Sequence, residues 1–149
     1  MVVRRCLAVL GLGLAVAGCR AKPVATVVLT APGTAEATFQ LGAKPVELWA
    51  DTDGTWSGNK RSTIHIDYDI EVIRDGATVS RSSCTTQDAR GSICGVRAST
   101  SSGQSGDCEF PLSCSVPALP SGPVTLRVTG RTGPSVTQVA LMSVDVRER

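Results

Sequence analysis

Alternating polar residues between positions 65 and 71 are the first place where this sequence could bind a cation. They are His65, Asp67, Asp69 and Glu71. On an extended strand such residues project from one face about 7 Å apart, and a hard cation such as Ca²⁺ requires several carboxylate oxygens. The row could equally attract a cationic partner. The alternative, which we favour, is a solvated sheet face whose charges are balanced by basic residues on neighbouring strands, such as Arg127.

A second candidate site is the segment 49–58, where two tryptophans flank two aspartates. These residues are Trp49, Asp51, Asp53 and Trp56. The pattern Asp-x-Asp-Gly resembles part of a calcium loop, although the later acidic ligand of an EF-hand is missing. An exposed Trp56 beside carboxylates would suit the binding of a sugar ring. More commonly, a tryptophan in such a segment folds back to cover the core. A carbohydrate- or calcium-binding module is therefore our second interpretation of the function.

The N-terminal 18 residues have the composition of a secretory signal peptide. Arg4 and Arg5 make a basic start, and the apolar stretch 6–17 is too short to cross a bilayer as a helix. Small residues then precede Cys19, in the sequence Val-Ala-Gly-Cys. This ending resembles the lipobox of bacterial lipoproteins.

The lipobox resemblance implies a lipid anchor. Residues 1–18 would be removed, Cys19 would carry diacylglycerol through a thioether and a further N-linked acyl chain such as palmitate, and residues 19–23 would form a short tether. Two or three acyl chains hold a protein firmly to a bilayer. Arg20, rather than an aspartate, follows the cysteine, which favours the outer membrane of a two-membrane bacterium. The competing interpretation is an ordinary signal peptide with an incidental cysteine.

Four cysteines remain beyond the lipobox, namely Cys84, Cys94, Cys108 and Cys114. An even number in an exported protein predicts two disulfides. Zinc is disfavoured because there is no Cys-x-x-Cys pair and the only histidine is His65. Of the three possible pairings we favour the nested one, Cys84 with Cys114 and Cys94 with Cys108. The local pairing, Cys84 with Cys94 and Cys108 with Cys114, stays open.

The segment 98–106 is rich in serine and glycine, and we expect it to be a mobile loop held at its base by the disulfides. Its Gly-Gln-Ser-Gly sequence approaches a nucleophile elbow, but Asp107 occupies the fifth position and His65 would have to act as the base. Oxidised cysteines are not nucleophiles. We therefore expect no enzyme and no catalytic residues.

Charge and size limit the function further. Without residues 1–18 the chain has 131 of its 149 residues, and 13 of its 15 basic residues then face 13 acidic ones. Because nucleic-acid binders carry a basic excess, we expect no nucleic-acid partner. We expect a single domain at 24–149, held at the membrane by its lipid and contacting an envelope protein or a glycan. Our leading interpretation is a non-enzymatic envelope lipoprotein that serves as a structural or protein-interaction module.

Apolar residues recur at every second position along the mature chain, which predicts strands. The clearest strand is 64–72, followed by an Asp-Gly hairpin turn into 78–80. Further strands are predicted at 24–30, 35–41, 46–51, 93–98, 124–130 and 136–146. Seven or eight short antiparallel strands must bury their apolar faces against one another. The sequence therefore predicts an all-β, two-sheet β-sandwich with a jelly-roll or immunoglobulin-like topology and two disulfides.

Overall fold

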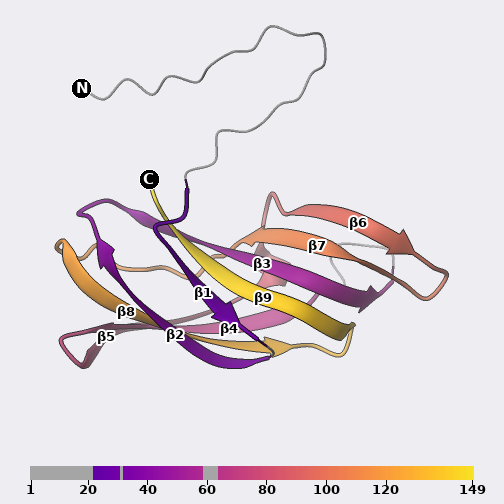
Figure 1. The fold of residues 1–149 in the computed structure, drawn as a ribbon, viewed down its shortest axis with the longest axis horizontal. Coiled ribbons are helices and arrows are strands. Elements are labelled where there is room, and N and C mark those ends of the chain that lie inside the picture. The colour runs from indigo at the N-terminus through magenta and orange to yellow at the C-terminus, as the bar shows by residue number, and fades with distance from the viewer. Residues whose placement is uncertain (1–21, 31, 59–63) are drawn as a thin grey trace, which may run out of the picture.

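The computed structural model describes residues 22–30, 32–58 and 64–149. Within these residues the chain forms nine strands, in two antiparallel sheets packed face to face (Figure 1). The elements are β1 (Ala25–Leu29), β2 (Gly33–Leu41), β3 (Val46–Ser57), β4 (Ile66–Arg74), β5 (Ala77–Thr85), the 3-10 helix η2 (Thr86–Asp88), β6 (Ile93–Ser99), β7 (Gly103–Pro111), β8 (Gly122–Thr132) and β9 (Val136–Glu148). No helix in this part has the length and apolar character needed to cross a bilayer. The predicted all-β sandwich is confirmed.

The strand order identifies the topology. One sheet has the order β1-β9-β3-β7-β6, and the other has the order β2-β8-β4-β5. The pairing is nested, since β1 pairs with β9, β2 with β8, β3 with β7, and β4 with β5. A chain folded back on itself and wrapped into two sheets in this way is a jelly roll. In an immunoglobulin-like sandwich the last two strands share a sheet, whereas β8 and β9 lie in different sheets.

Alternation of side chains along each strand builds the core. In β4, Ile66, Tyr68, Ile70 and Val72 are buried between the sheets, and the residues between them point outward. The single tyrosine, Tyr68, faces the hydroxyl of Thr52 on β3 across the core, and neither hydroxyl completes a hydrogen bond of good geometry. Burial raises the pKa of Tyr68 to about 12. The predicted Asp-Gly turn joins β4 to β5, with positive φ angles of 52° at Asp75 and 76° at Gly76.

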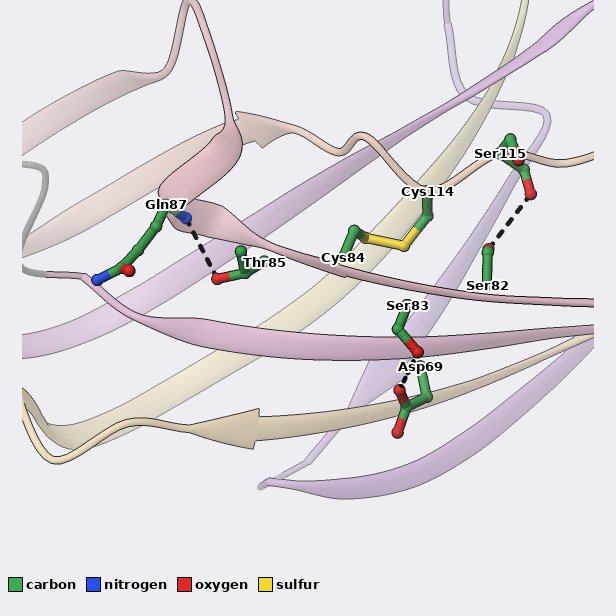
Figure 2. Close-up of a disulfide and its surroundings, with 8 residues drawn as sticks. All are labelled: Asp69, Ser82, Ser83, Cys84, Thr85, Gln87, Cys114 and Ser115. Atoms are coloured by element: carbon green, nitrogen blue, oxygen red, sulfur yellow. Dashed lines mark hydrogen bonds between the residues drawn. A yellow bond between two sulfur atoms is a disulfide. The ribbon is translucent and has the colours of Figure 1, made fainter.

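The two sides of the sandwich are closed in different ways. On one side, β1 and β2 contact one another directly. On the other, the disulfide Cys84–Cys114 joins β5 of the four-stranded sheet to the segment that follows β7 of the five-stranded sheet (Figure 2). Beside it, the Ser82 hydroxyl donates to the carbonyl of Ser115 at 3.3 Å. The second disulfide, Cys94–Cys108, links directly opposite residues of β6 and β7. The cysteines thus have the nested pairing.

The serine- and glycine-rich segment 98–106 is not the mobile loop that its composition suggested. It forms the end of β6, a short turn and the start of β7, and β7 is the additional strand that the sequence prediction missed. The glycines serve close packing of strands, because a Cβ on Gly103 would collide with the carbonyl oxygen of Trp56 and one on Gly106 with that of Gly95. Although segment 98–106 has few side chains to bury, its backbone is held in the sheet because β7 pairs with β3 on one side and with β6 on the other.

Candidate functional site

The predicted acidic row on β4 is part of a charge ladder across the four-stranded sheet. Glu36 on β2, Arg127 on β8, Glu71 on β4 and Arg81 on β5 lie opposite one another in register. Arg127 bridges the two glutamates, with Nε 2.5 Å from Glu36 Oε1 and Nη1 2.6 Å from Glu71 Oε2. Arg81 Nε lies 2.6 Å from the other oxygen of Glu71. Both oxygens of Glu71 are therefore engaged by guanidinium groups.

The rest of the predicted row is also paired. Asp69 accepts a hydrogen bond of 2.6 Å from Arg131 Nη1 and one of 2.7 Å from the Ser83 hydroxyl, the latter shown in Figure 2. His65 lies before β4, with Nε2 3.0 Å from Asp67 Oδ1. The arginine partners lower the pKa of Asp69 and of Glu71 below their ordinary values. The carboxylates of the row therefore have basic or hydroxyl partners on the same face. Among the described residues, no group of three or more side chains that could hold a metal ion is found.

The second predicted set is divided between the two faces of β3. The segment 49–58 is not a turn, because β3 runs from Val46 to Ser57, paired with β7 on one side and with β9 on the other. Trp56 points into the core and is 4% exposed. Trp49, Asp51 and Asp53 point outward from the same strand. The structure therefore separates Trp56 from the other three candidates and gives it the role of covering the core.

Trp49 is covered by an arginine. The Arg147 guanidinium on β9 lies over the indole ring, 5.0 Å from its centre. Arg147 is itself only 7% exposed, and its Nη2 lies 2.9 Å from Asp145 Oδ2 and 3.8 Å from Glu109 Oε2. The ring face that would stack on a sugar is thus occupied by a cation held between two carboxylates.

Five carboxylates gather around these residues on the outer surface of the five-stranded sheet, which we call the acidic face. They are Asp51 and Asp53 on β3, Asp107 and Glu109 on β7, and Asp145 on β9. The register places Asp51 opposite Glu109 and Asp53 opposite Asp107. Arg147 and Arg97 lie among them. Sequence reasoning missed Asp107, Glu109, Asp145 and Arg147, because only the strand order brings them next to β3.

Asp51 lies at the centre of the acidic face. Partial burial is the main cause that raises its pKa, and repulsion from Glu109, Asp145, Asp107 and Asp53 adds to it. Asp53 behaves in the opposite way, since hydrogen bonds from Arg97 lower its pKa. Arg97 is the extra residue of a β-bulge in β6, between Val96 and Ala98, and it reaches across β7 to Asp53.

Cys19, the predicted lipidation site, lies outside the described residues. No family profile and no curated protein matches this sequence.

Proposed function

We propose that this protein is a lipid-anchored, non-enzymatic component of the bacterial cell envelope whose β-sandwich binds another envelope protein through the acidic face. The Val-Ala-Gly-Cys sequence at 16–19 supports the anchor and the envelope location, with the outer membrane favoured. The partner is a protein with a cationic surface, because charge complementarity is what steers and selects partners of an acidic surface.

The observation that carries this proposal is the contrast between the two outer faces. On the four-stranded sheet, Glu36, Arg127, Glu71 and Arg81 alternate in sign, and the pairs between them bring their charges close to balance. On the five-stranded sheet, the carboxylates of the acidic face outnumber the guanidinium groups among them, and partial burial, with repulsion from the neighbouring carboxylates added to it, raises the pKa of Asp51. A cationic partner would relieve that repulsion, and this would favour binding at the acidic face over binding at the charge-balanced face.

The same geometry favours protein contact over the carbohydrate or calcium alternative. Trp56 is buried in the core, so its ring cannot stack on a sugar. Arg147 covers one face of the Trp49 ring, so that face is not open to a sugar either. Asp53 is paired with Arg97. A sugar or calcium ion would first have to displace these arginines, whereas a basic protein surface could approach the carboxylates without doing so.

The anchor would hold the domain close to the membrane. β1 begins at Ala25, six residues after Cys19, and an extended chain of that length reaches about 20 Å. The start of β1 lies beside the end of β9, where the amide of Val24 donates to the carbonyl of Val146 at 2.8 Å. The acidic face includes Asp145 on β9, the strand next to β1, and would therefore lie close to the lipid surface.

Crosslinking in cells tests the contact. A photoreactive residue in place of Asp107, which is exposed on the acidic face, should trap one dominant envelope protein, and the further substitution E109K in that probe-bearing protein should abolish the product. D88K makes the same kind of charge change on η2, away from the acidic face, and should leave the product intact. Diffuse labelling, or equal loss with D88K, would refute the proposal.

Inhibition of the lipoprotein signal peptidase tests the anchor separately. The full-length precursor should accumulate, and mass spectrometry of the untreated protein should find acyl chains on Cys19. Normal processing under the block would refute the anchor while leaving the protein contact to be judged by the crosslink.

A further inference from the structure

The edge strand β6 is weakly held to the rest of the sandwich. Among the described strands it pairs with β7 alone, and it lies at the outer margin of the five-stranded sheet (Figure 1). Every side chain of β6 is exposed except that of Cys94, which is partly buried. Two of the exposed side chains, Ile93 and Val96, are apolar and about half exposed. Burial of apolar side chains therefore contributes little to keeping this strand in place.

Three kinds of interaction hold β6 to the rest of the five-stranded sheet. The first is the backbone ladder, which the bulge at Arg97 interrupts. The second is the ion pair of Arg97 with Asp53, and exposed pairs of this kind contribute little. The third is the disulfide between Cys94 and Cys108, which face one another directly with Cα atoms 4.1 Å apart. The disulfide is the one cross-link between these two strands, which the chain otherwise joins only through the turn at 100–102.

The two disulfides differ in exposure. Cys84 and Cys114 are 8% and 7% exposed and lie between the two sheets. In the other bridge Cys108 is buried, but Cys94 is partly open at the edge of the sandwich. Thiol–disulfide exchange requires access of a thiolate to one sulfur, so Cys94 is the sulfur that a reductant can reach first.

We propose that Cys94–Cys108 is a redox-sensitive latch on β6. A dithiol reductant opens it: one thiolate attacks Sγ of Cys94, the S–S bond breaks, and Sγ of Cys108 leaves with the bonding electrons and takes up a proton. The second thiol of the reductant then attacks the mixed disulfide, which frees Cys94 as a thiol and leaves the reductant oxidised to its disulfide. β6 then detaches, while the other eight strands and Cys84–Cys114 stay in place.

Opening the latch alters the acidic face. Arg97 leaves with β6, so Asp53 loses its hydrogen-bonding partner and Asp107 loses a guanidinium 3.9 Å away. The face becomes more negative, and the outer edge of β7 is left without a neighbouring strand. The latch itself does not depend on the proposed partner, because its opening can be measured on the isolated domain.

Graded reduction of the purified protein tests the latch. The protein is incubated with increasing dithiothreitol, the thiols are alkylated, and the labelled cysteines are identified by mass spectrometry. Cys94 and Cys108 should be labelled together, at concentrations about tenfold lower than those needed for Cys84 and Cys114. Labelling of Cys84 and Cys114 first, or of all four together with loss of the folded state, would overturn the proposal.

Hydrogen exchange of the half-reduced protein supplies the second readout. The amides of residues 93–99 should exchange at least about tenfold faster than in the oxidised protein, while those of β4 and β9 keep their protection. The variant C94A/C108A should show the same pattern without any reductant. Unchanged protection of β6 in the half-reduced protein would show that the backbone ladder alone holds the strand, and would overturn the latch even if the variant fails to fold.

Discussion

The guanidinium of Arg147 lies over the indole ring of Trp49, 5.0 Å from its centre, on the outer surface of the five-stranded sheet. These two residues come from β9 and β3, which are adjacent only because the last strand of the jelly roll inserts between β1 and β3. In this contact the indole ring packs against the arginine, and the same arginine forms an ion pair with Asp145 on the acidic face.

Substitution of Arg147 by alanine should destabilise the domain by about 1 to 2 kcal/mol, because a buried cation–π contact and a charge-assisted hydrogen bond are lost. Tryptophan emission should also shift to the red as water reaches Trp49. Urea denaturation followed by fluorescence measures both effects. Arg149→Ala, which removes an exposed arginine paired with Glu47, should change neither by much. An unshifted emission maximum in R147A would contradict the contact.

Substitution of Asp51 by asparagine should stabilise the fold at neutral pH while weakening partner capture. The pKa of Asp51 is raised in the folded state, so its ionisation opposes folding in full above the folded-state value, and that opposition fades as the pH falls from there to the ordinary value of 3.8. We expect a gain on the order of 0.5 kcal/mol at pH 7 that vanishes in acid.

The matched control for this prediction is Asp53→Asn. Its carboxylate has a lowered pKa because of Arg97, so the same chemical change two residues away should destabilise the protein at pH 7. Urea unfolding of both variants between pH 3 and 7 makes the comparison. If both substitutions changed the free energy of unfolding at pH 7 in the same direction, the opposite pKa shifts of Asp51 and Asp53 would be contradicted.

The charge ladder should make the protein sensitive to acid. Asp69 and Glu71 have lowered pKa values in the fold, relative to ordinary values of 3.8 and 4.5. The stability they contribute is present above those ordinary values and is lost as the pH falls through the folded-state values. Glu71→Gln should therefore be less stable than the natural protein at pH 7 and approach it below about pH 4. The urea midpoints of Glu71→Gln and of the natural protein, measured from pH 7 to below about pH 4, test the effect. A difference between the two midpoints that stays constant with pH would argue against it.

Ionisation of Tyr68 should reduce the stability of the protein at alkaline pH. Its pKa is raised to about 12 from an ordinary value of 10.0, so the folded state retains the proton that the unfolded state releases. Stability should be full below pH 10 and decline between about pH 10 and 12. Because the chain has one tyrosine, absorbance at long ultraviolet wavelength reports its ionisation directly. Tyr68→Phe should remove this part of the alkaline decline, and titration near pH 10 in the folded protein would contradict the burial.

Removal of the inter-sheet bridge should cost more stability than removal of the edge bridge. Cys84 and Cys114 are separated by 30 residues and join the two sheets, whereas Cys94 and Cys108 are separated by 14 within one sheet. The variant C84A/C114A should lose about 3 to 4 kcal/mol. Thermal unfolding of the two double variants gives the order, and a larger loss in C94A/C108A would contradict it.

Side-chain alternation was enough to predict most of the fold. β4 carries apolar residues at every second position, and such a strand is recognisable without knowledge of its neighbours. The predicted strand at 46–51 covers only the first half of β3, because the Asp-x-Asp-Gly sequence of the second half resembles part of a calcium loop. That second half is a strand because β7 and β9 pair with it from both sides, which is a tertiary effect that outweighs local preference.

The candidate site was less predictable for a similar reason. Asp51 and Asp53 were recognised as candidates, but their real neighbours, Glu109 and Asp145, lie far along the chain and are joined to them only by strand order. For the charge row on β4, one true neighbour was foreseeable, because Arg127 lies on a predicted strand, and the structure pairs that strand with β4. Sequence patterns identified which residues face outward, but not which outward-facing residues meet.

Nested pairing also determines when this domain can fold during its synthesis. β4 and β5 are local and can form a hairpin early, but each further layer of the jelly roll joins segments that are more distant in sequence, and β1 pairs only with β9. Loop-closure entropy makes such distant pairing slow. The sandwich therefore cannot close on the ribosome until β9 has emerged. Until then the nascent chain stays open, with the partners of its first strands still unmade.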